Sequence, residues 1–175
     1  LLEEIAIYEL LTKIFTIFII PFSVFGQVLA PNIVDIYTKE EGSKVKKIFS
    51  KLLKYLFLIS MVYIPLSIFL IRLGISLIFP IYSNQVLDAI IIPVALTYAI
   101  AIPVTVLNAG ILTSTGHAKL MAIQNVVSGI VNVILNIIVV KKYGYIGVIW
   151  TTFSIQLIST IVLYNIWLKK PFKKE

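Results

Sequence analysis

Five stretches of this sequence are long and apolar enough to cross a lipid bilayer, and they limit the possible folds more than any other feature. A spanning helix needs about 20 mostly apolar residues, because each residue adds 1.5 Å to its length and the hydrocarbon core is about 30 Å thick. The alternation of period two that marks a strand is absent. The sequence therefore predicts an all-α, polytopic transmembrane helix bundle of about five spans. These spans cover residues 5–30, 52–73, 89–113, 120–140 and 147–168.

The composition also favours lipid over water as the surrounding solvent. Hydrophobic residues make up 59% of the chain and charged residues 13%, against about 45–50% and about 25% in soluble domains. The net charge of +7 does not indicate a nucleic-acid partner, since the lysines stand in short clusters between the apolar runs. We expect a multi-pass protein of the cell membrane whose first partner is membrane lipid.

The distribution of cations predicts the orientation in the membrane. Cytoplasmic loops carry an excess of Lys and Arg, which places the C-terminus and the 38–51 loop in the cytoplasm. The opposite side receives only Arg72, Lys141 and Lys142. Five spans then put residue 1 outside, and the odd number leaves one face of the bundle without a partner. We therefore expect this chain to be a C-terminal half, with an N-terminal bundle supplied by the same protein or by a second subunit. The cations on the cytoplasmic side are Lys39, Lys44, Lys46, Lys47, Lys51, Lys54, Lys119, Lys169, Lys170, Lys173 and Lys174.

A basic segment over residues 39–54 precedes the second span. Four lysines recur there at spacings of three and four, so they form one helical stripe, with apolar residues such as Val45 and Phe49 on the other side. The pattern predicts an amphipathic helix at the cytoplasmic membrane surface, attracted by anionic lipid. The alternative is a charged connector that only anchors the loop. The stripe consists of Lys44, Lys47, Lys51 and Lys54.

The fourth span contains amides where a membrane disfavours them. Asn125, Asn132 and Asn136 share one helical face with Gly129, and Gln124 lies one step away. A buried amide in lipid needs a partner. Two interpretations remain open: the amides pack this helix against a neighbour, or they line a hydrated cavity that holds substrate.

Polar residues in the first and third spans are also candidates for a substrate cavity. Glu9 and Lys13 form an i, i+4 pair in the favoured order. Either Lys13 reaches outward and is neutralised locally, or it faces a cavity and meets an anionic group such as a pyrophosphate. Gln27 and Asn108 are isolated polar residues, for which packing is the preferred interpretation.

The sequence gives no sign of an enzyme. It lacks cysteine and has a single histidine, His117, so neither metal-ligand spacing nor a thiolate nucleophile is present. No phosphate loop, catalytic triad or carboxylate pair appears. We expect no catalytic residue, no metal site and no cofactor.

The motifs and their order resemble the polysaccharide-biosynthesis flippases of the multidrug/oligosaccharidyl-lipid/polysaccharide exporter superfamily. In NVILNIIVVKKYGYIGVIWTTFSIQL, Asn132 and Asn136 match the paired asparagines of the family signature, and Tyr143-Gly144 matches its turn. Val148 and Ile149 replace the usual alanines. Tyr8-Glu9 with Lys13, Ala30-Pro31 with Ile36-Tyr37, and Gly116 to Lys119 also fit, so the similarity extends over the whole chain.

This resemblance implies a function. Such proteins pair two six-helix bundles and open a central cavity alternately to each membrane face. The chain would then be most of the C-terminal bundle of a MATE-like flippase, with a lipid-linked oligosaccharide or polysaccharide precursor as substrate. Alternatives are a cation-coupled multidrug antiporter of the same superfamily and a non-transporting membrane subunit or truncated remnant.

Overall fold

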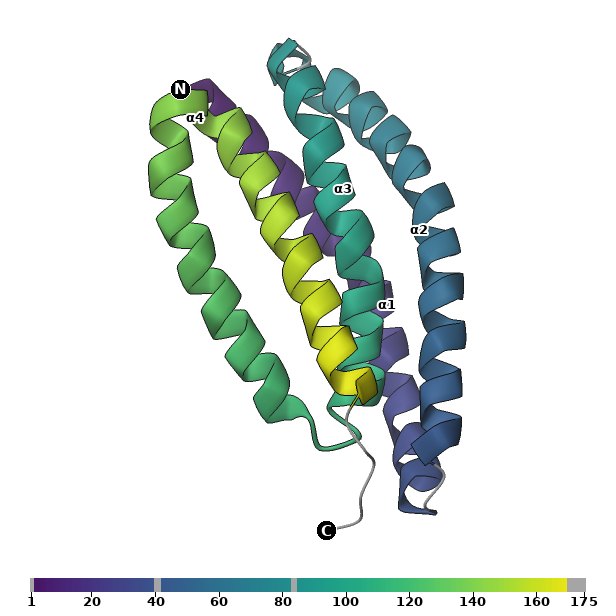
Figure 1. Cartoon of the computed structure of the whole chain (residues 1–175). Coiled ribbons are helices and arrows are strands. Elements are labelled where there is room, and N and C mark those ends of the chain that lie inside the picture. Colours follow the sequence, from purple (N-terminus) through teal and green to yellow (C-terminus); the bar gives the residue numbers. More distant parts are fainter. Residues whose placement is uncertain (1, 40–41, 83–84, 170–175) are drawn as a thin grey trace.

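The computed structural model describes residues 2–39, 42–82 and 85–169, and these residues are almost entirely helical (Figure 1). The part of the chain so described contains no strand, and four of its helices are long and apolar enough to cross a membrane. The predicted all-α class is therefore confirmed. The elements are α1 (Leu2–Thr38), α2 (Gly42–Ile78), the 3₁₀ turn η1 (Pro80–Tyr82), α3 (Gln85–Leu107), the π-helix η2 (Asn108–Leu112) and α4 (Ala118–Lys169).

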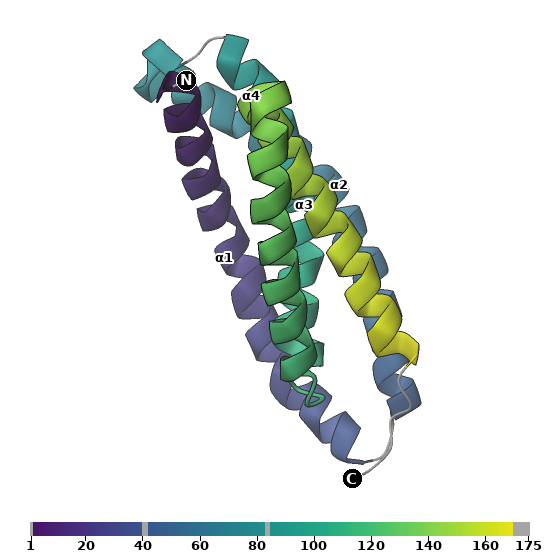
Figure 2. The same cartoon turned by 60° about the vertical axis from the view of Figure 1, so that its left-hand side comes forward.

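Helix α4 is a hairpin of two antiparallel arms, residues 118–143 (the first arm) and 145–169 (the second arm), as Figures 1 and 2 show. The reversal is made at Gly144, whose φ of 62° and ψ of −157° lie in a region that glycine alone adopts readily. Gly147 then allows a close approach, because a Cβ atom there would lie 2.6 Å from side-chain atoms of both Val139 and Tyr143. These arms correspond to the stretches 120–140 and 147–168.

Helix α3 lies at the centre and contacts α1, α2 and α4. It is apolar on all sides, as expected of a helix surrounded by protein and lipid. Pro93 and Pro103 lie inside it without ending it, and Pro21, Pro31 and Pro65 are likewise internal to α1 and α2. Because Pro21 and Pro31 do not end it, α1 runs to Thr38, beyond the predicted end of the first span at residue 30.

The basic segment is the beginning of α2 and not a separate helix. Residues 42–54 continue without a break into the second span, and residues 40 and 41 lie outside the described part. Val45 and Phe49 are fully buried, and the centroid of the Phe49 ring lies 4.6 Å from that of the Trp167 ring of α4. The predicted two-sided pattern is present, and Val45 and Phe49 of its apolar side pack against protein, while the position of this helix at the membrane surface stays a prediction. The exposed side carries Lys44, Lys47, Lys51 and Lys54.

The crossing of α1 with the end of α3 depends on two glycines. A Cβ atom on Gly26 would lie 3.0 Å from the Val106 carbonyl oxygen, and one on Gly110 would lie 2.9 Å from the Gly26 carbonyl oxygen. Both distances are shorter than an ordinary van der Waals contact with backbone, which cannot move aside as a flexible side chain can. The two helices therefore touch backbone to backbone, as small residues permit in membrane bundles.

Replacing either of these glycines should destabilise the bundle. We expect Gly110→Ala and Gly26→Ala to lower the thermal unfolding midpoint in detergent, because the added methyl group must push α1 away from α3 and so loosen the packing by about 1–3 kcal/mol. Gly74→Ala is the matched control, since a Cβ atom at Gly74 would meet nothing within 4 Å. Equal midpoints for Gly110→Ala and Gly74→Ala would show that the close crossing does not matter.

Candidate functional site: a polar hollow beside α4

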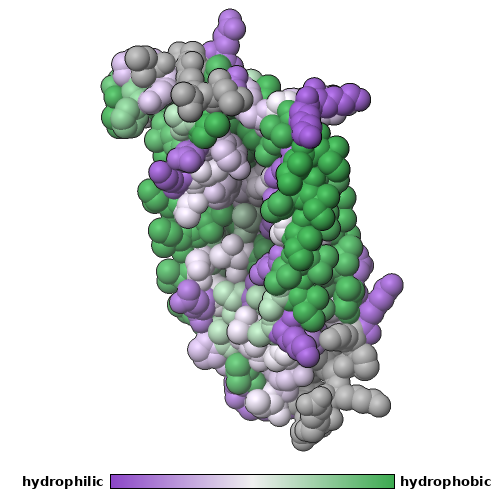
Figure 3. All heavy atoms as spheres, turned by 90° about the vertical axis from the view of Figure 1, so that its left-hand side faces the viewer, coloured by the Kyte–Doolittle hydropathy of each residue, from purple (hydrophilic) through white to green (hydrophobic). Residues whose placement is uncertain are grey.

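A hollow runs along one face of the molecule, between α1 and the first arm of α4 (Figure 3). Hydrophilic and weakly polar residues gather inside it and along its edges, while the outer side of the first arm is hydrophobic. No residue of the first arm is buried, and the first buried residue of α4 is Ile149 in the second arm. The first arm thus stands beside the rest of the bundle instead of within it.

The amides of the first arm lie on the edge of this hollow. Asn125, Asn132 and Asn136 recur at spacings of seven and four, so they share one helical face. Between its terminal lysines, the only strongly hydrophilic residues of this arm are these three and Gln124. Figure 3 shows hydrophilic atoms along the edge of the hollow where the first arm borders it. The structure therefore brings four of the predicted site residues to one arm, on or next to one face.

Asn132 and Asn136 differ in how their amides are satisfied. The Oδ1 atom of Asn132 accepts a hydrogen bond from the Thr152 hydroxyl of the second arm at 3.3 Å. The Oδ1 atom of Asn136 is shielded from solvent and has no hydrogen-bond partner among the described residues. Asn132 thus contributes to holding the two arms together, in agreement with the packing interpretation, whereas the Asn136 Oδ1 atom is a shielded acceptor without a partner among the described residues.

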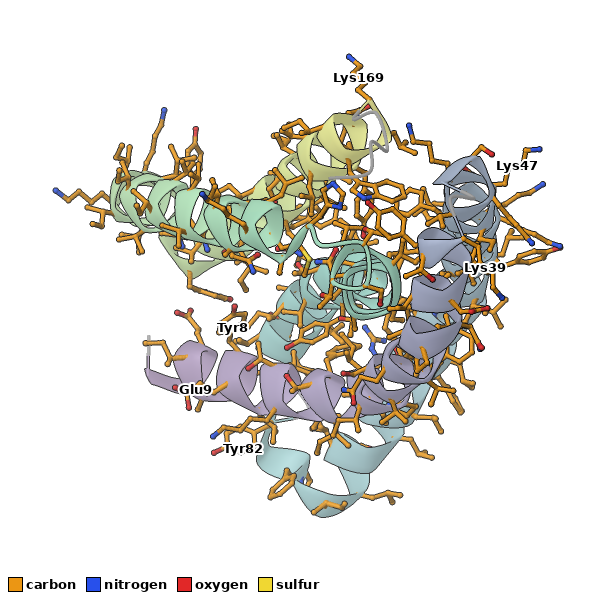
Figure 4. All side chains as sticks on the ribbon, turned by 90° about the horizontal axis from the view of Figure 1, so that it is seen from below. Tyr8, Glu9, Lys39, Lys47, Tyr82 and Lys169 are labelled. Carbon is orange, nitrogen blue, oxygen red and sulfur yellow. The ribbon has the colours of Figure 1, made fainter. Side chains whose placement is uncertain are left out.

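Hydroxyl groups join α1 to α3 at a second polar position. The Tyr98 hydroxyl donates to the Thr12 carbonyl at 2.9 Å, and it lies 3.0 Å from the Thr16 hydroxyl. Thr16 is exposed, and Tyr8 on the same helix extends toward α4 in Figure 4. This cluster was not among the residues predicted from sequence, because threonine and tyrosine are common in membrane helices and only the contact across helices distinguishes these.

Lys13 and Gln27 lie on α1 and are not in contact with the amides of α4. The Lys13 ammonium is 3.8 Å from the Glu9 carboxylate, and the two side chains are 77% and 64% exposed. Figure 4 shows Glu9 on a different side of α1 from Tyr8. The exposed Gln27 amide lies 3.4 Å from the Ser23 hydroxyl of its own helix. The pairing of Lys13 with Glu9 agrees with local neutralisation, and its exposure leaves the ammonium accessible.

Asn108 begins the π-helix η2, next to the crossing of α1 and α3. Its carbonyl oxygen accepts hydrogen bonds from both the backbone N–H and the hydroxyl of Thr113, at 3.0 and 2.9 Å. Its side-chain Oδ1 atom is shielded and has no hydrogen-bond partner in the part of the chain that the structure describes. A π-helix is less favourable than an α-helix and is often found at functional sites. Sequence reasoning singled out Asn108 but gave no signal for the change of helix type.

An apolar groove lies between the two arms of α4, on a side of the first arm different from the amide face. It encloses about 410 Å³. Leu120, Val127 and Leu135 line it from the first arm, and Ile155 and Ile166 from the second. Gln124 belongs to this groove, which separates it from Asn125, Asn132 and Asn136. Sequence reasoning did not find the groove, because it depends on how far the arms stand apart.

Comparison with known proteins adds no relative. No family model, curated protein or solved structure matches this chain.

The two asparagines should respond differently to the same substitution. We expect Asn132→Leu to lower the thermal midpoint in detergent by the loss of its bond to Thr152, about 0.6–2 kcal/mol. Asn136→Leu should leave the midpoint unchanged or raise it, because it removes a shielded acceptor that has no partner.

A double-mutant cycle provides the control. Thr152→Val should destabilise about as much as Asn132→Leu, and the double variant should be no worse than either single variant. Additive losses in the double variant would contradict a direct bond between these side chains.

Proposed function

We propose that this chain forms the C-terminal part of a membrane transporter, with five spans, that moves lipid-linked oligosaccharide or polysaccharide precursors across the membrane by alternating access. The observation that carries the proposal is the amide-lined hollow beside a helix arm that has no buried residue. Amides within an apolar span are unfavourable against lipid and are typical of a hydrated path for a polar substrate. The sugar hydroxyls of a glycan are well suited to amide hydrogen bonds.

The placement of charge supports a membrane orientation with a cytoplasmic C-terminus. The start of α2, the start of the first arm and the end of the second arm lie at one end of the molecule in Figure 1. Described lysines concentrate there, whereas Arg72, Lys141 and Lys142 belong to segments at the opposite end. Lys170, Lys173 and Lys174, which were counted with the first group, lie outside the described residues.

The proposal includes a second bundle that faces the first arm and closes the hollow. It would belong to the same protein or to another subunit, and it would cover the face of the first arm that carries Asn125 and Asn136. The two bundles would then open the hollow alternately to each side, as in other transporters built from repeated halves.

Flipping of a fluorescent lipid-linked oligosaccharide by the complete purified protein in vesicles tests this function. We expect Asn136→Leu to reduce the flipping rate by at least tenfold while the thermal midpoint is maintained, since the variant removes an amide from the face proposed to meet substrate and breaks no hydrogen bond within the described residues. Asn165→Leu is the matched control, because that amide donates to the Ile161 carbonyl of its own helix at 2.8 Å. A wild-type rate equal to that of empty vesicles would favour a non-transporting subunit.

The role of Lys13 can be tested in the same assay. If its ammonium binds the pyrophosphate of the carrier lipid, Lys13→Ala should abolish flipping with little loss of folded protein. Glu9→Gln removes only the local partner and should keep flipping near the wild-type rate. Retained transport in Lys13→Ala would exclude this role and leave local neutralisation as the function of the pair.

A further inference from the structure

We propose that the groove between the arms of α4 binds one acyl chain of an anionic phospholipid, whose headgroup is held by Lys119 and Lys169. The inference requires that the chain lie in a bilayer, but it does not depend on transport. It concerns a side of the first arm different from the one that carries the asparagines.

The interior of the groove matches a hydrocarbon chain. Its lining is apolar apart from Gln124, Ser128 and Ser159. The Ser128 hydroxyl donates to the Gln124 carbonyl at 2.7 Å, and the Ser159 hydroxyl donates to the Gln156 carbonyl at 3.2 Å. Because both donors are used within their own helices, the groove offers a ligand few hydrogen bonds and mainly van der Waals contact.

The groove is longer than the hydrocarbon depth of one leaflet. Leu120 and Leu135 both line it, which corresponds to about 22 Å along the helix axis. One leaflet contributes about half of the 30 Å hydrocarbon core. A chain that enters at the Leu120 end can therefore lie in the groove over the full depth of its leaflet.

The positive charge at the groove entrance favours an anionic headgroup. Lys119 directly precedes Leu120, and Lys169 follows Ile166 by three residues, so both stand at the same end of the hairpin. Helix α4 contains no Asp or Glu. Among the described residues, neither lysine takes part in an ion pair. Two lysines without acidic partners at the membrane surface attract a phosphate.

A phospholipid explains the groove better than a helix of another protein. The arms are joined by a tight turn, where Gly147 closely approaches Val139 and Tyr143. A helix with side chains is about 10 Å wide, which is more than a groove between two directly connected neighbours readily admits. A single acyl chain is much thinner and adapts to the lining.

Native mass spectrometry of the complete protein tests the proposal, with phosphatidylglycerol and phosphatidylcholine of identical acyl chains as probes. We expect the protein to retain one phosphatidylglycerol in preference to phosphatidylcholine. The double variant Lys119→Gln/Lys169→Gln should lower the affinity for phosphatidylglycerol by about 30-fold, since each lysine near the surface contributes about fivefold. Lys141→Gln/Lys142→Gln makes the same change of charge at the other end of the hairpin and should have no effect.

A second pair of variants tests the groove itself. Val127→Phe fills it and should reduce the retention of both lipids, whereas Ile137→Phe, at an exposed position of the same arm outside the groove lining, should not. Equal retention of the two lipids by the wild type, or full retention by either the double lysine variant or Val127→Phe, would overturn the proposal.

Because the chain has no cysteine, Val127→Cys introduces a single thiol, and a disulfide-linked dimer in membranes would show that a second copy occupies the groove instead.

Discussion

The contact between the backbones of Gly26 and Gly110 is the constraint on which the rest of the arrangement depends. It brings α1 against the end of α3, and α3 in turn contacts α2 and α4. In lipid, apolar side chains gain little by leaving the solvent, so helices associate chiefly through close packing and polar contacts. A glycine crossing of this kind places α1 firmly against the end of α3, and the first arm of α4 takes no part in it.

The fold could be read from the sequence to a large extent, because long apolar runs leave a backbone few alternatives to the helix in a membrane. The reversal between residues 140 and 147 was also readable, since Gly144 and Gly147 mark the turn. It was harder to predict from the sequence which helix faces pack against one another. Val45 and Phe49 form one side of an amphipathic pattern that suits lipid and protein equally well, and only the position of Trp167, more than a hundred residues away, decides that they pack on protein.

The sequence indicates which face of the first arm carries the candidate residues but not the individual partners of those residues. The spacing of Asn125, Asn132 and Asn136 places them on one face, yet it cannot show that Asn132 bonds to Thr152 and that the Asn136 Oδ1 atom has no hydrogen-bond partner among the described residues. Likewise, the ion pair between Arg72 and Asp88 at 2.7 Å joins α2 to α3, although each residue taken alone resembles an interface anchor or a helix cap. Contacts of this kind join distant residues, and one sequence contains no direct record of them.

The first arm of α4 faces a different environment on each of three sides. One side carries the asparagines toward the hollow, a second forms the apolar groove with the second arm, and a third presents residues such as Val133 and Ile137 that are largely exposed. A helix that only packed in a bundle would bury one of these sides, and this arm buries none. Because the arm is held at its start by Leu120 and Met121, at the turn and through Asn132, changes in its angle between these points would alter the hollow and the groove together. A lipid held in the groove would therefore stiffen the arm on the side away from the amides and restrict how far the hollow can open.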